Sequence, residues 1–385
     1  MKEKFERNIE FHLKDYKAMV KDLFDHPEVG NQEFQSSKKL TDLIKKMGFA
    51  VEYPYICPTG FKGEYKAAKA GPTIGFLCEY DALPEVGHGC GHNLIGVMSI
   101  AAAVALKEVI EDIGGKIVLF GTPAEENFGG KVEFANHHAF DQVDVAMMLH
   151  PATCNQVGAR TNALYPVKFE FFGVNAHGAK PFEGRSALDA AVLTYTGISM
   201  LRQYCKPNTY IHGVIKNGGS AANVIPAYAS MEYYFRAPNM NYAKEIASRA
   251  ITIAQGAAHQ AEVKMEHSIY ECPYEDKKIN YTLSHKLKQI YESLGLEDIL
   301  DVNEIPGGSS DVGAVSYVCP TIEGQIKIAE ACVRGHSKEM ALATIQENGT
   351  KAIVNGGSAL ALLAYDFITD AQFAKDVMDE FQSQK

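Results

Sequence analysis

Phe76-Leu-Cys-Glu-Tyr-Asp-Ala-Leu-Pro-Glu-Val-Gly-His-Gly-Cys-Gly-His-Asn93 joins the end of an apolar run to a glycine-rich loop. Asp81 follows the apolar run, and the loop carries the triplet Cys90-Gly91-His92. Cysteine and histidine are ligands suited to zinc and similar ions, and the single glycine between them lets both side chains point at one centre. The stretch therefore predicts a strand followed by a metal-binding loop.

Two further apolar runs end in residues of the same chemistry. The first, 117–120, leads into Gly121-Thr-Pro-Ala-Glu-Glu126, and the second, 143–149, ends at His150. Open α/β sheets build their sites at the carboxyl ends of such strands. Adjacent carboxylates cannot easily share one role, so one of the two glutamates can bind metal while the other takes a proton from water. The pattern predicts a hydrolytic metal centre.

These residues allow other interpretations. A Cys-x-His loop alone is more often structural, and a Glu-Glu turn alone is more often a solvated surface. Cys90 could instead be a nucleophile activated by a nearby base, but that leaves the paired glutamates unexplained. A catalytically silent binding protein of the same fold would lack a base or a ligand, and no such residue is missing. Metal-dependent hydrolysis is the interpretation that uses all the residues.

Length and composition exclude several classes of protein. A chain of 385 residues favours two domains, and the formal net charge of −10 argues against a nucleic-acid-binding surface. The start of the chain is charged and shows no signal peptide, and the most apolar helix candidate, 94–106, is too short to span a bilayer. The eight cysteines lack a tight repeating spacing and are interpreted as reduced thiols. We expect a cytoplasmic protein that interacts with neither nucleic acid nor membrane.

Hydrophobic periodicity predicts an α/β fold with a mostly parallel sheet and helices on both faces. The first part of this catalytic domain is expected over residues 1–163 and its second part over 277–385. Asn93 is expected to cap the long apolar helix that ends before Gly114-Gly115. The other elements expected in this domain are helices near 5–24, 33–47, 282–294 and 350–368, and strands near 48–53, 73–78 and 320–322.

Residues 164–276 have a different character and are predicted to form an inserted domain. Strands and helices alternate in the order βαββαβ, which is the ferredoxin-like α+β arrangement. His177 lies in a glycine-rich loop of this domain, where its imidazole could face a developing oxyanion. His150 and His336 follow strand-like segments, although a lone histidine is more often a packed or surface residue than a ligand.

The chain resembles the dinuclear metal-dependent aminoacylase and carboxypeptidase family of amidohydrolases, in peptidase clan MH. Within that family it is most similar to the branch of hippurate hydrolase, indole-acetyl-amino-acid hydrolase and p-aminobenzoyl-glutamate hydrolase. The motifs that carry the resemblance run almost from end to end in the right order: His26-Pro-Glu-x-Gly-x-x-Glu33, Tyr80-Asp-Ala-Leu-Pro84, Gly89-Cys-Gly-His-Asn93, Pro123-Ala-Glu-Glu126, His150-Pro151, Ala176-His-Gly-Ala-x-Pro181, Gly184-Arg-Ser-Ala-Leu-Asp-Ala190, Asn223-Val-Ile-Pro226, Gly308-Ser-Ser-Asp311 and Gly335-His336.

The resemblance implies a role for each residue of the site. Two divalent ions, zinc or manganese, would be held by five side chains: Cys90, His92, Glu126, His150 and His336. Glu125 would be the general base, and Asp81 would support the site. The inserted domain would be a dimerisation or lid domain, and His177 would reach the site of the neighbouring subunit. Asn223 and Arg236 match positions that in relatives contact the carbonyl and the carboxylate of the substrate.

The implied activity is hydrolysis of the amide bond of an N-acyl amino acid or a small dipeptide by a homodimer. One residue departs from the common pattern of this branch, because Asn93 stands where Cys-Gly-His is usually followed by aspartate. Dipeptidase-like and p-aminobenzoyl-glutamate-type relatives tolerate that change. The departure therefore argues against a hippurate-type substrate more than against metal binding.

Overall fold

The computed structural model describes residues 1–384, which divide into two compact units. Unit 1 consists of Met1–Arg160, Lys277–Ile305 and the residues from Ser310 onward. Unit 2 consists of Thr161–Asp276 and Pro306–Ser309. Unit 2 is thus inserted into the chain of unit 1, and the predicted fold class, an α/β domain with an inserted α+β domain, is confirmed.

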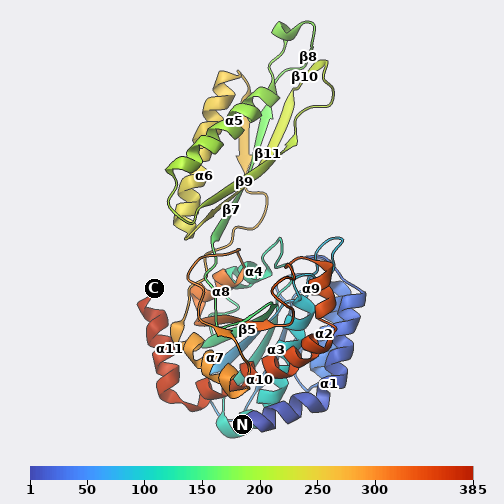
Figure 1. Ribbon diagram of the computed structural model, residues 1–385, viewed down its shortest axis with the longest axis vertical. Coiled ribbons are helices and arrows are strands. Elements are labelled where there is room, and N and C mark those ends of the chain that lie inside the picture. The colour runs from blue at the N-terminus through green and yellow to red at the C-terminus, as the bar shows by residue number, and fades with distance from the viewer. Residues whose placement is uncertain (385) are drawn as a thin grey trace. The chain divides into compact units, whose positions relative to one another are not determined.

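A twisted sheet of eight strands forms the centre of unit 1 (Figure 1). Its inner strands are parallel, because β3 pairs with β4 and β5, and β5 pairs with β14. The edge formed by β1 and β2 is antiparallel. In spatial order the strands are β1 (Ala50–Glu52), β2 (Phe61–Lys66), β4 (Lys116–Gly121), β3 (Thr73–Cys78), β5 (Val145–Ala152), β14 (Thr321–Lys327), β6 (Asn155–Gln156) and β13 (Ile299–Leu300).

Helices cover both faces of this sheet because its buried strands present apolar side chains on both sides. Along β4, Ile117 and Leu119 join one core, whereas Val118 and Phe120 join the other. The larger core contains α1 (Lys2–Asp25), α2 (Phe34–Lys46), α3 (His92–Ile113), α7 (Tyr281–Ser293), α10 (Glu347–Thr369) and α11 (Ala371–Ser383), and the smaller core contains α4 (Gly130–Asn136) and α8 (Val312–Val318). The short helix α9 (Lys338–Ala343) precedes α10.

The beginning of α3 differs from the prediction. The helix starts at His92 after Gly91, and Asn93 lies inside its first turn, so the predicted cap at Asn93 is wrong. The Asn93 side chain is buried and donates hydrogen bonds to the carbonyl of Val20 and the hydroxyl of Thr344. It therefore ties α3 to two neighbouring segments of unit 1. The end of α3 at Gly114 is as predicted.

The helices α3 and α10 are long and apolar enough to cross a membrane by length and composition. Both belong to the larger core of unit 1, and 89% of the apolar window in α3 is buried inside the protein. Burial inside a core accounts for their composition.

Unit 2 has the predicted βαββαβ order, built around an antiparallel sheet with the strand order β12-β7-β11-β9. Its main elements are β7 (Ala163–Phe172), α5 (Ala187–Leu201), β9 (Tyr210–Asn217), β11 (Tyr228–Ala237), α6 (Met240–Gln260) and β12 (Lys264–Ser268). Both helices pack on the core face of the sheet. Two short strands, β8 (Ala176–His177) and β10 (Val224–Ile225), pair with each other, and two 3-10 turns cover Pro181–Glu183 and Arg202–Tyr204.

Candidate metal centre

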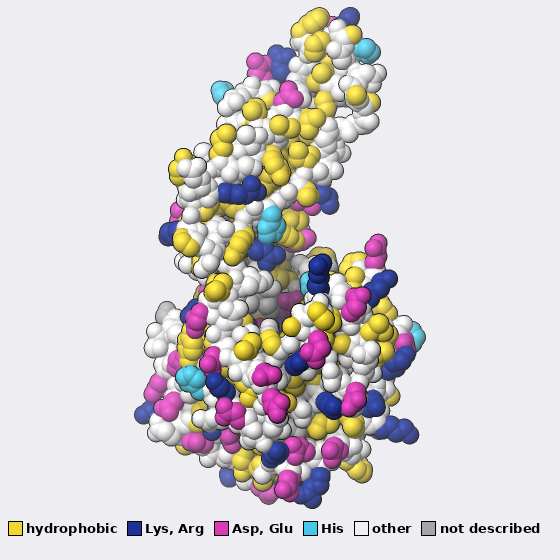
Figure 2. Space-filling model, viewed as in Figure 1, with side chains coloured by type: hydrophobic (Ala, Val, Ile, Leu, Met, Phe, Trp, Pro, Cys, Tyr) yellow, Lys and Arg dark blue, Asp and Glu magenta, His cyan; other side chains and the backbone are white. Residues whose placement is uncertain are grey.

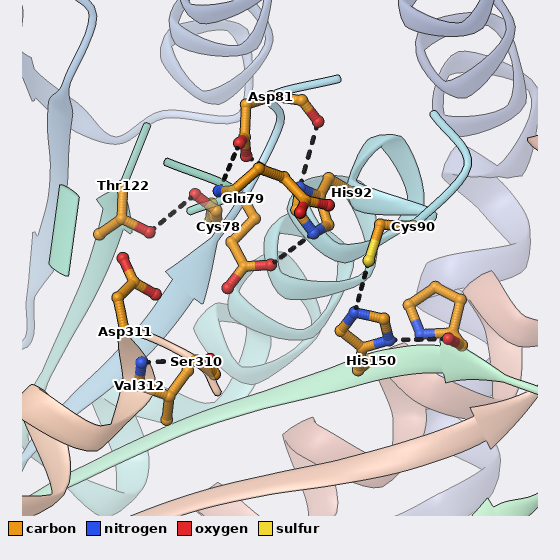
Figure 3. Close-up of polar contacts among 12 residues, drawn as sticks. Cys78, Glu79, Asp81, Cys90, His92, Thr122, His150, Ser310, Asp311 and Val312 are labelled. Atoms are coloured by element: carbon orange, nitrogen blue, oxygen red, sulfur yellow. Dashed lines mark hydrogen bonds and ion pairs between the residues drawn. The ribbon is translucent and has the colours of Figure 1, made fainter. Parts of the chain in front are cut away.

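Cysteine, histidine and carboxylate side chains from four segments of unit 1 converge beside the carboxyl ends of β3, β4 and β5. Figure 3 shows three of them, Cys90, His92 and His150. Each of three groups of side chains brings its ligand atoms within 4.8 Å of one another. The groups are Cys90 with His92 and His150, Cys90 with Glu126 and His336, and His92 with Glu125 and Glu126. Because the groups share members, together they form one continuous site.

The backbone at Gly91 places Cys90 and His92 in this site. Gly91 has a φ of +83°, a conformation that residues with a Cβ rarely adopt, and a Cβ there would lie 2.9 Å from Pro151. The chain can therefore turn sharply between the cysteine and the first residue of α3. The sulphur of Cys90 then lies 3.4 Å from His150 Nε2 and 3.6 Å from His336 Nε2.

A second turn, after β4, presents the two glutamates. Ala124 is held at a φ of +59°. Its backbone N–H donates a 2.8 Å hydrogen bond to the buried carboxylate of Glu33, whose other oxygen accepts from the hydroxyl of Thr59. Glu33 thus supports an unusual backbone conformation immediately before Glu125 and Glu126. The sequence contained Glu33 in a recognised motif but gave no reason for this role.

His150 and His336 reach the site in different ways. His150 lies within β5 rather than after its end, and its Nδ1 donates to the carbonyl of Pro151, which leaves Nε2 facing Cys90. His336 is on an exposed loop with a φ of +56°, and its backbone N–H donates to the carbonyl of Gly89. Its Nε2 lies 3.6 Å from Glu126 Oε1. Both imidazoles therefore present Nε2 to the centre.

Asp81 orients two of the other side chains. Its Oδ1 accepts a 2.8 Å hydrogen bond from His92 Nδ1, and its Oδ2 accepts a 3.0 Å bond from the backbone N–H of Glu126. Burial would lower the pKa of His92, but the nearby Asp81 and Cys90 raise that pKa well above its usual value. An imidazole that donates from Nδ1 to a carboxylate is a common arrangement for a metal ligand, because it fixes the ring and its tautomer.

The buried acidic groups of the site would be stabilised by bound cations. Burial raises the pKa of Glu125 well above its usual value, and the carboxylates of Glu79 and Asp311 reinforce the effect. Burial also raises the pKa of the Cys90 thiol to about 12. A divalent ion offsets both effects, because it stabilises carboxylates and deprotonates a coordinating thiol. The donor set of thiol, imidazoles and carboxylates therefore fits divalent metal ions.

A buried lysine not predicted from the sequence lies next to this cluster. The Lys131 side chain in α4 is fully buried, and its Nζ lies 2.6 Å from Glu79 Oε1 and 2.7 Å from Asp311 Oδ1. Asp311 also accepts a hydrogen bond from the backbone N–H of Lys131. From sequence, a lysine beside a glycine is read as a solvated residue. These ion pairs join residues far apart in the chain, so no local sequence pattern predicts them.

The three remaining candidates, His177, Asn223 and Arg236, lie in unit 2. His177 and Asn223 are exposed and adjacent, because the N–H of Gly178 donates to the carbonyl of Asn223. The His177 ring accepts at Nδ1 from the N–H of Ala179, which leaves Nε2 as the donor in the neutral imidazole. Arg236 lies near the far end of β11 and donates a 2.7 Å hydrogen bond to Ser309.

The chain is similar in sequence to known peptidases and amide hydrolases. Residues 75–354 match Peptidase family M20/M25/M40. The Xaa-Arg dipeptidase of Mus musculus is 34% identical over 381 residues, which cover 95% of this chain and 88% of that protein. A p-aminobenzoyl-glutamate hydrolase chain of Escherichia coli (strain K12) is 36% identical over 281 residues, covering 67% of this chain and 58% of that one.

Solved structures share the fold. A dinuclear metal-binding peptidase of the M20 family from Bacillus subtilis superimposes with a TM-score of 0.64. The superposition covers 92% of this chain and 99% of that chain, at 18% sequence identity. The whole two-unit architecture is therefore common to both chains.

Proposed function

We infer that this chain, which belongs to Peptidase family M20/M25/M40, is a metal-dependent amidohydrolase that cleaves the amide bond of a dipeptide or an N-acyl amino acid. The observation that carries the proposal is the converging set of Cys90, His92, Glu126, His150 and His336 with a further carboxylate, Glu125, beside it. Relatives named as a dipeptidase and as a p-aminobenzoyl-glutamate hydrolase support the substrate class. Both names describe hydrolysis of a bond between an acyl group and an amine.

Five side chains would hold two divalent ions, and we propose zinc or manganese. When bound, such ions act as Lewis acids toward a carbonyl and lower the pKa of water. The mixed thiol, imidazole and carboxylate donor set suits zinc, and the carboxylates also suit manganese. Asp81 would fix the orientation of the His92 ring.

Glu125 is the proposed general base. Its neighbour Glu126 has Oε1 3.6 Å from His336 Nε2, which supports assigning Glu126 to the ligand set. Glu125 would accept the proton of the attacking water and later deliver it to the departing amine. His177 would donate from Nε2 to the oxyanion that forms on the scissile carbonyl, and Asn223 would contact the same carbonyl. Arg236 would bind the substrate carboxylate, for which its planar guanidinium is suited.

We further propose that the protein is a cytoplasmic homodimer formed through unit 2. Large apolar side chains lie exposed on α5 and on β9, which is an edge strand of the sheet (Figure 2). Exposed apolar clusters and free strand edges are typical of association surfaces. The exposed residues are Val192, Leu193, Tyr195 and Met200 on α5, and Tyr210, Val214 and Ile215 on β9.

The direct test of the activity is a substrate panel assayed with metal-loaded protein. The panel should include Xaa-Arg and other dipeptides, N-acetyl amino acids and p-aminobenzoyl-glutamate, with release of the free amine as the readout. We expect turnover on at least one member, its loss on treatment with a chelator, and its return on adding zinc or manganese. No turnover on any member by protein shown to contain metal would contradict the proposal.

The Cys90→Ser variant distinguishes between the two possible roles of Cys90, metal ligand and nucleophile. A serine hydroxyl is a much poorer ligand than a thiolate, so we expect metal affinity to fall by about 10-fold or more. Excess metal should then restore part of the activity, as an assay across a metal titration would show. A nucleophilic cysteine predicts instead that added metal has no effect and that substrate labels Cys90.

A further inference from the structure

Glu79 is a buried carboxylate that the proposed function leaves without a role. It follows β3 directly, two residues before Asp81, and its side chain is 1% exposed. Its Oε2 has no hydrogen-bond partner among the described residues, and its one polar contact is with His92 Nε2 at 3.3 Å, which is an ion pair only if that ring is protonated (Figure 3). Burying a carboxylate oxygen with no partner is costly, so this oxygen needs an explanation.

The hydrogen bond of His92 Nδ1 to Asp81 orients the ring so that Nε2 lies beside Glu79 Oε2. His92 Nδ1 lies 2.8 Å from a carboxylate oxygen of Asp81, and an ionised carboxylate only accepts hydrogen bonds, so Nδ1 carries a proton. Where His92 acts as a metal ligand, as proposed above, its Nε2 lone pair faces the ion, and Glu79 Oε2 lies 3.3 Å from that nitrogen. An ion bound to Nε2 would therefore lie beside this oxygen and offset its negative charge. His92 Nε2 also has no hydrogen-bond partner among residues 1–384.

The spacing matches two ligands of one ion. Nitrogen and oxygen ligands lie about 2.0–2.2 Å from zinc, so two of them in tetrahedral geometry are about 3.3 Å apart. The separation between His92 Nε2 and Glu79 Oε2 is 3.3 Å. The proposed ligand atoms Cys90 Sγ and His150 Nε2 have a similar separation of 3.4 Å.

Lys131 holds the Glu79 carboxylate in this position. The Lys131 ammonium binds the oxygen of Glu79 that does not face His92, at 2.6 Å, and the same ammonium binds Asp311 at 2.7 Å. All three side chains are buried, so their mutual positions are fixed by packing as well as by charge. Glu79 therefore has one oxygen committed to a cation of the protein and the other directed at the metal centre.

We propose that Glu79 is a further ligand of the metal centre, bound through Oε2, and that Lys131 and Asp311 position its carboxylate. This inference rests on the proposed metal-dependent function. It adds an anionic ligand next to His92.

The test is a titration of the metal-free full-length protein with Co²⁺, followed by visible absorption and by calorimetry. Glu79→Gln keeps the shape of the side chain and can still accept from Lys131, but it cannot supply an anionic oxygen. We expect the affinity for one of the two ions to fall more than about 100-fold, beyond the ~10–100-fold that loss of a supporting residue costs. The Co²⁺ absorption bands, which report the ligands of the ion, should change as well.

Asp311→Asn is the matched control, because it removes the same charge from the same lysine without contacting His92. Because Asp311 only helps to position the carboxylate, its loss should cost no more than the ~10–100-fold in Co²⁺ affinity that loss of a supporting residue typically costs. Glu79→Asp is the second variant. It preserves the charge beside Lys131 but withdraws the oxygen by one methylene, so it should lose the same ion even if Glu79→Gln does not fold.

The outcomes separate this inference from the proposed function. If the unaltered protein binds two ions and Glu79→Gln and Glu79→Asp bind both with less than about a 100-fold loss, Glu79 is not a ligand. An equal loss in Asp311→Asn would show that disturbing the buried ion pairs is sufficient, and would also overturn the inference. Failure of the unaltered protein to bind Co²⁺ would instead contradict the proposed function itself.

Discussion

Glu125→Gln should lower turnover by about 10²–10⁴-fold while the protein keeps its metal ions. The amide has the shape of the carboxylate but cannot take a proton from water. Steady-state turnover on the best substrate, measured together with metal content by elemental analysis, checks both parts of this expectation. Only the combination of lost turnover and retained metal identifies a general base.

Glu126→Gln is the control for this experiment, since the two residues are neighbours on the same turn. Glu126 Oε1 lies 3.6 Å from His336 Nε2, within the proposed ligand set. Its replacement should therefore lower metal content as well as activity. If Glu125→Gln loses metal and Glu126→Gln retains it without activity, the two roles are reversed.

The roles of these neighbours depend on a backbone conformation that the sequence did not reveal. The adjacent carboxylates and the apolar run before them predicted a turn after a strand, and β4 ends at Gly121 as expected. The left-handed conformation of Ala124 and its support by Glu33 are tertiary features, because 91 residues separate the hydrogen-bonded pair. The local sequence indicated where the carboxylates lie, but it did not indicate which contacts orient them.

The same distinction holds for the cysteine loop. The strand 73–78 has the predicted bounds, and Gly91 has the conformation that lets Cys90 and His92 face one centre. The predicted cap at Asn93 failed because α3 starts at His92, directly after the left-handed Gly91, two residues before the start that a cap at Asn93 would give. The Asn93 amide then serves long-range hydrogen bonds, which periodicity and capping rules do not register.

The burial and the ion pairs of Lys131 could not be predicted from the sequence. A lysine is almost never fully buried unless it is paired, so its default interpretation is a solvated residue. Here its partners are Glu79 and Asp311, which are 52 and 180 residues away in the chain. Removing the charge of Lys131 would leave two buried carboxylates without their cation, a change that typically costs about 3–5 kcal/mol. Only the folded chain shows that the metal centre is embedded in this network.

His177→Ala mixed with Glu125→Gln should regenerate activity, although each variant alone should be nearly inactive. Loss of an oxyanion donor typically costs about 10²–10³-fold in turnover. In a mixed dimer, one site would combine the intact Glu125 of one chain with the intact His177 of the other. The measurement is turnover of the mixture after subunit exchange, compared with each variant at the same total concentration.

The geometry of unit 2 supports an action of His177 across subunits. His177 and Asn223 lie beside the start of β11, whereas Arg236 lies near its end. From Tyr228 to Arg236 the strand extends about 27 Å, at about 3.4 Å per residue. A dipeptide or N-acyl amino acid is much shorter than that, so one chain cannot apply both His177 and Arg236 to the same substrate molecule.

Two chains can meet this requirement if each supplies one end of unit 2 to a given site. Arg236 and the metal ligands would then come from one subunit, and His177 with Asn223 from its partner. If His177 served its own chain, every site in the mixture would lack either the base or the oxyanion donor, and no activity would return. A protein that is monomeric at assay concentration would contradict the arrangement equally, because its sites would have no partner from which to receive the imidazole.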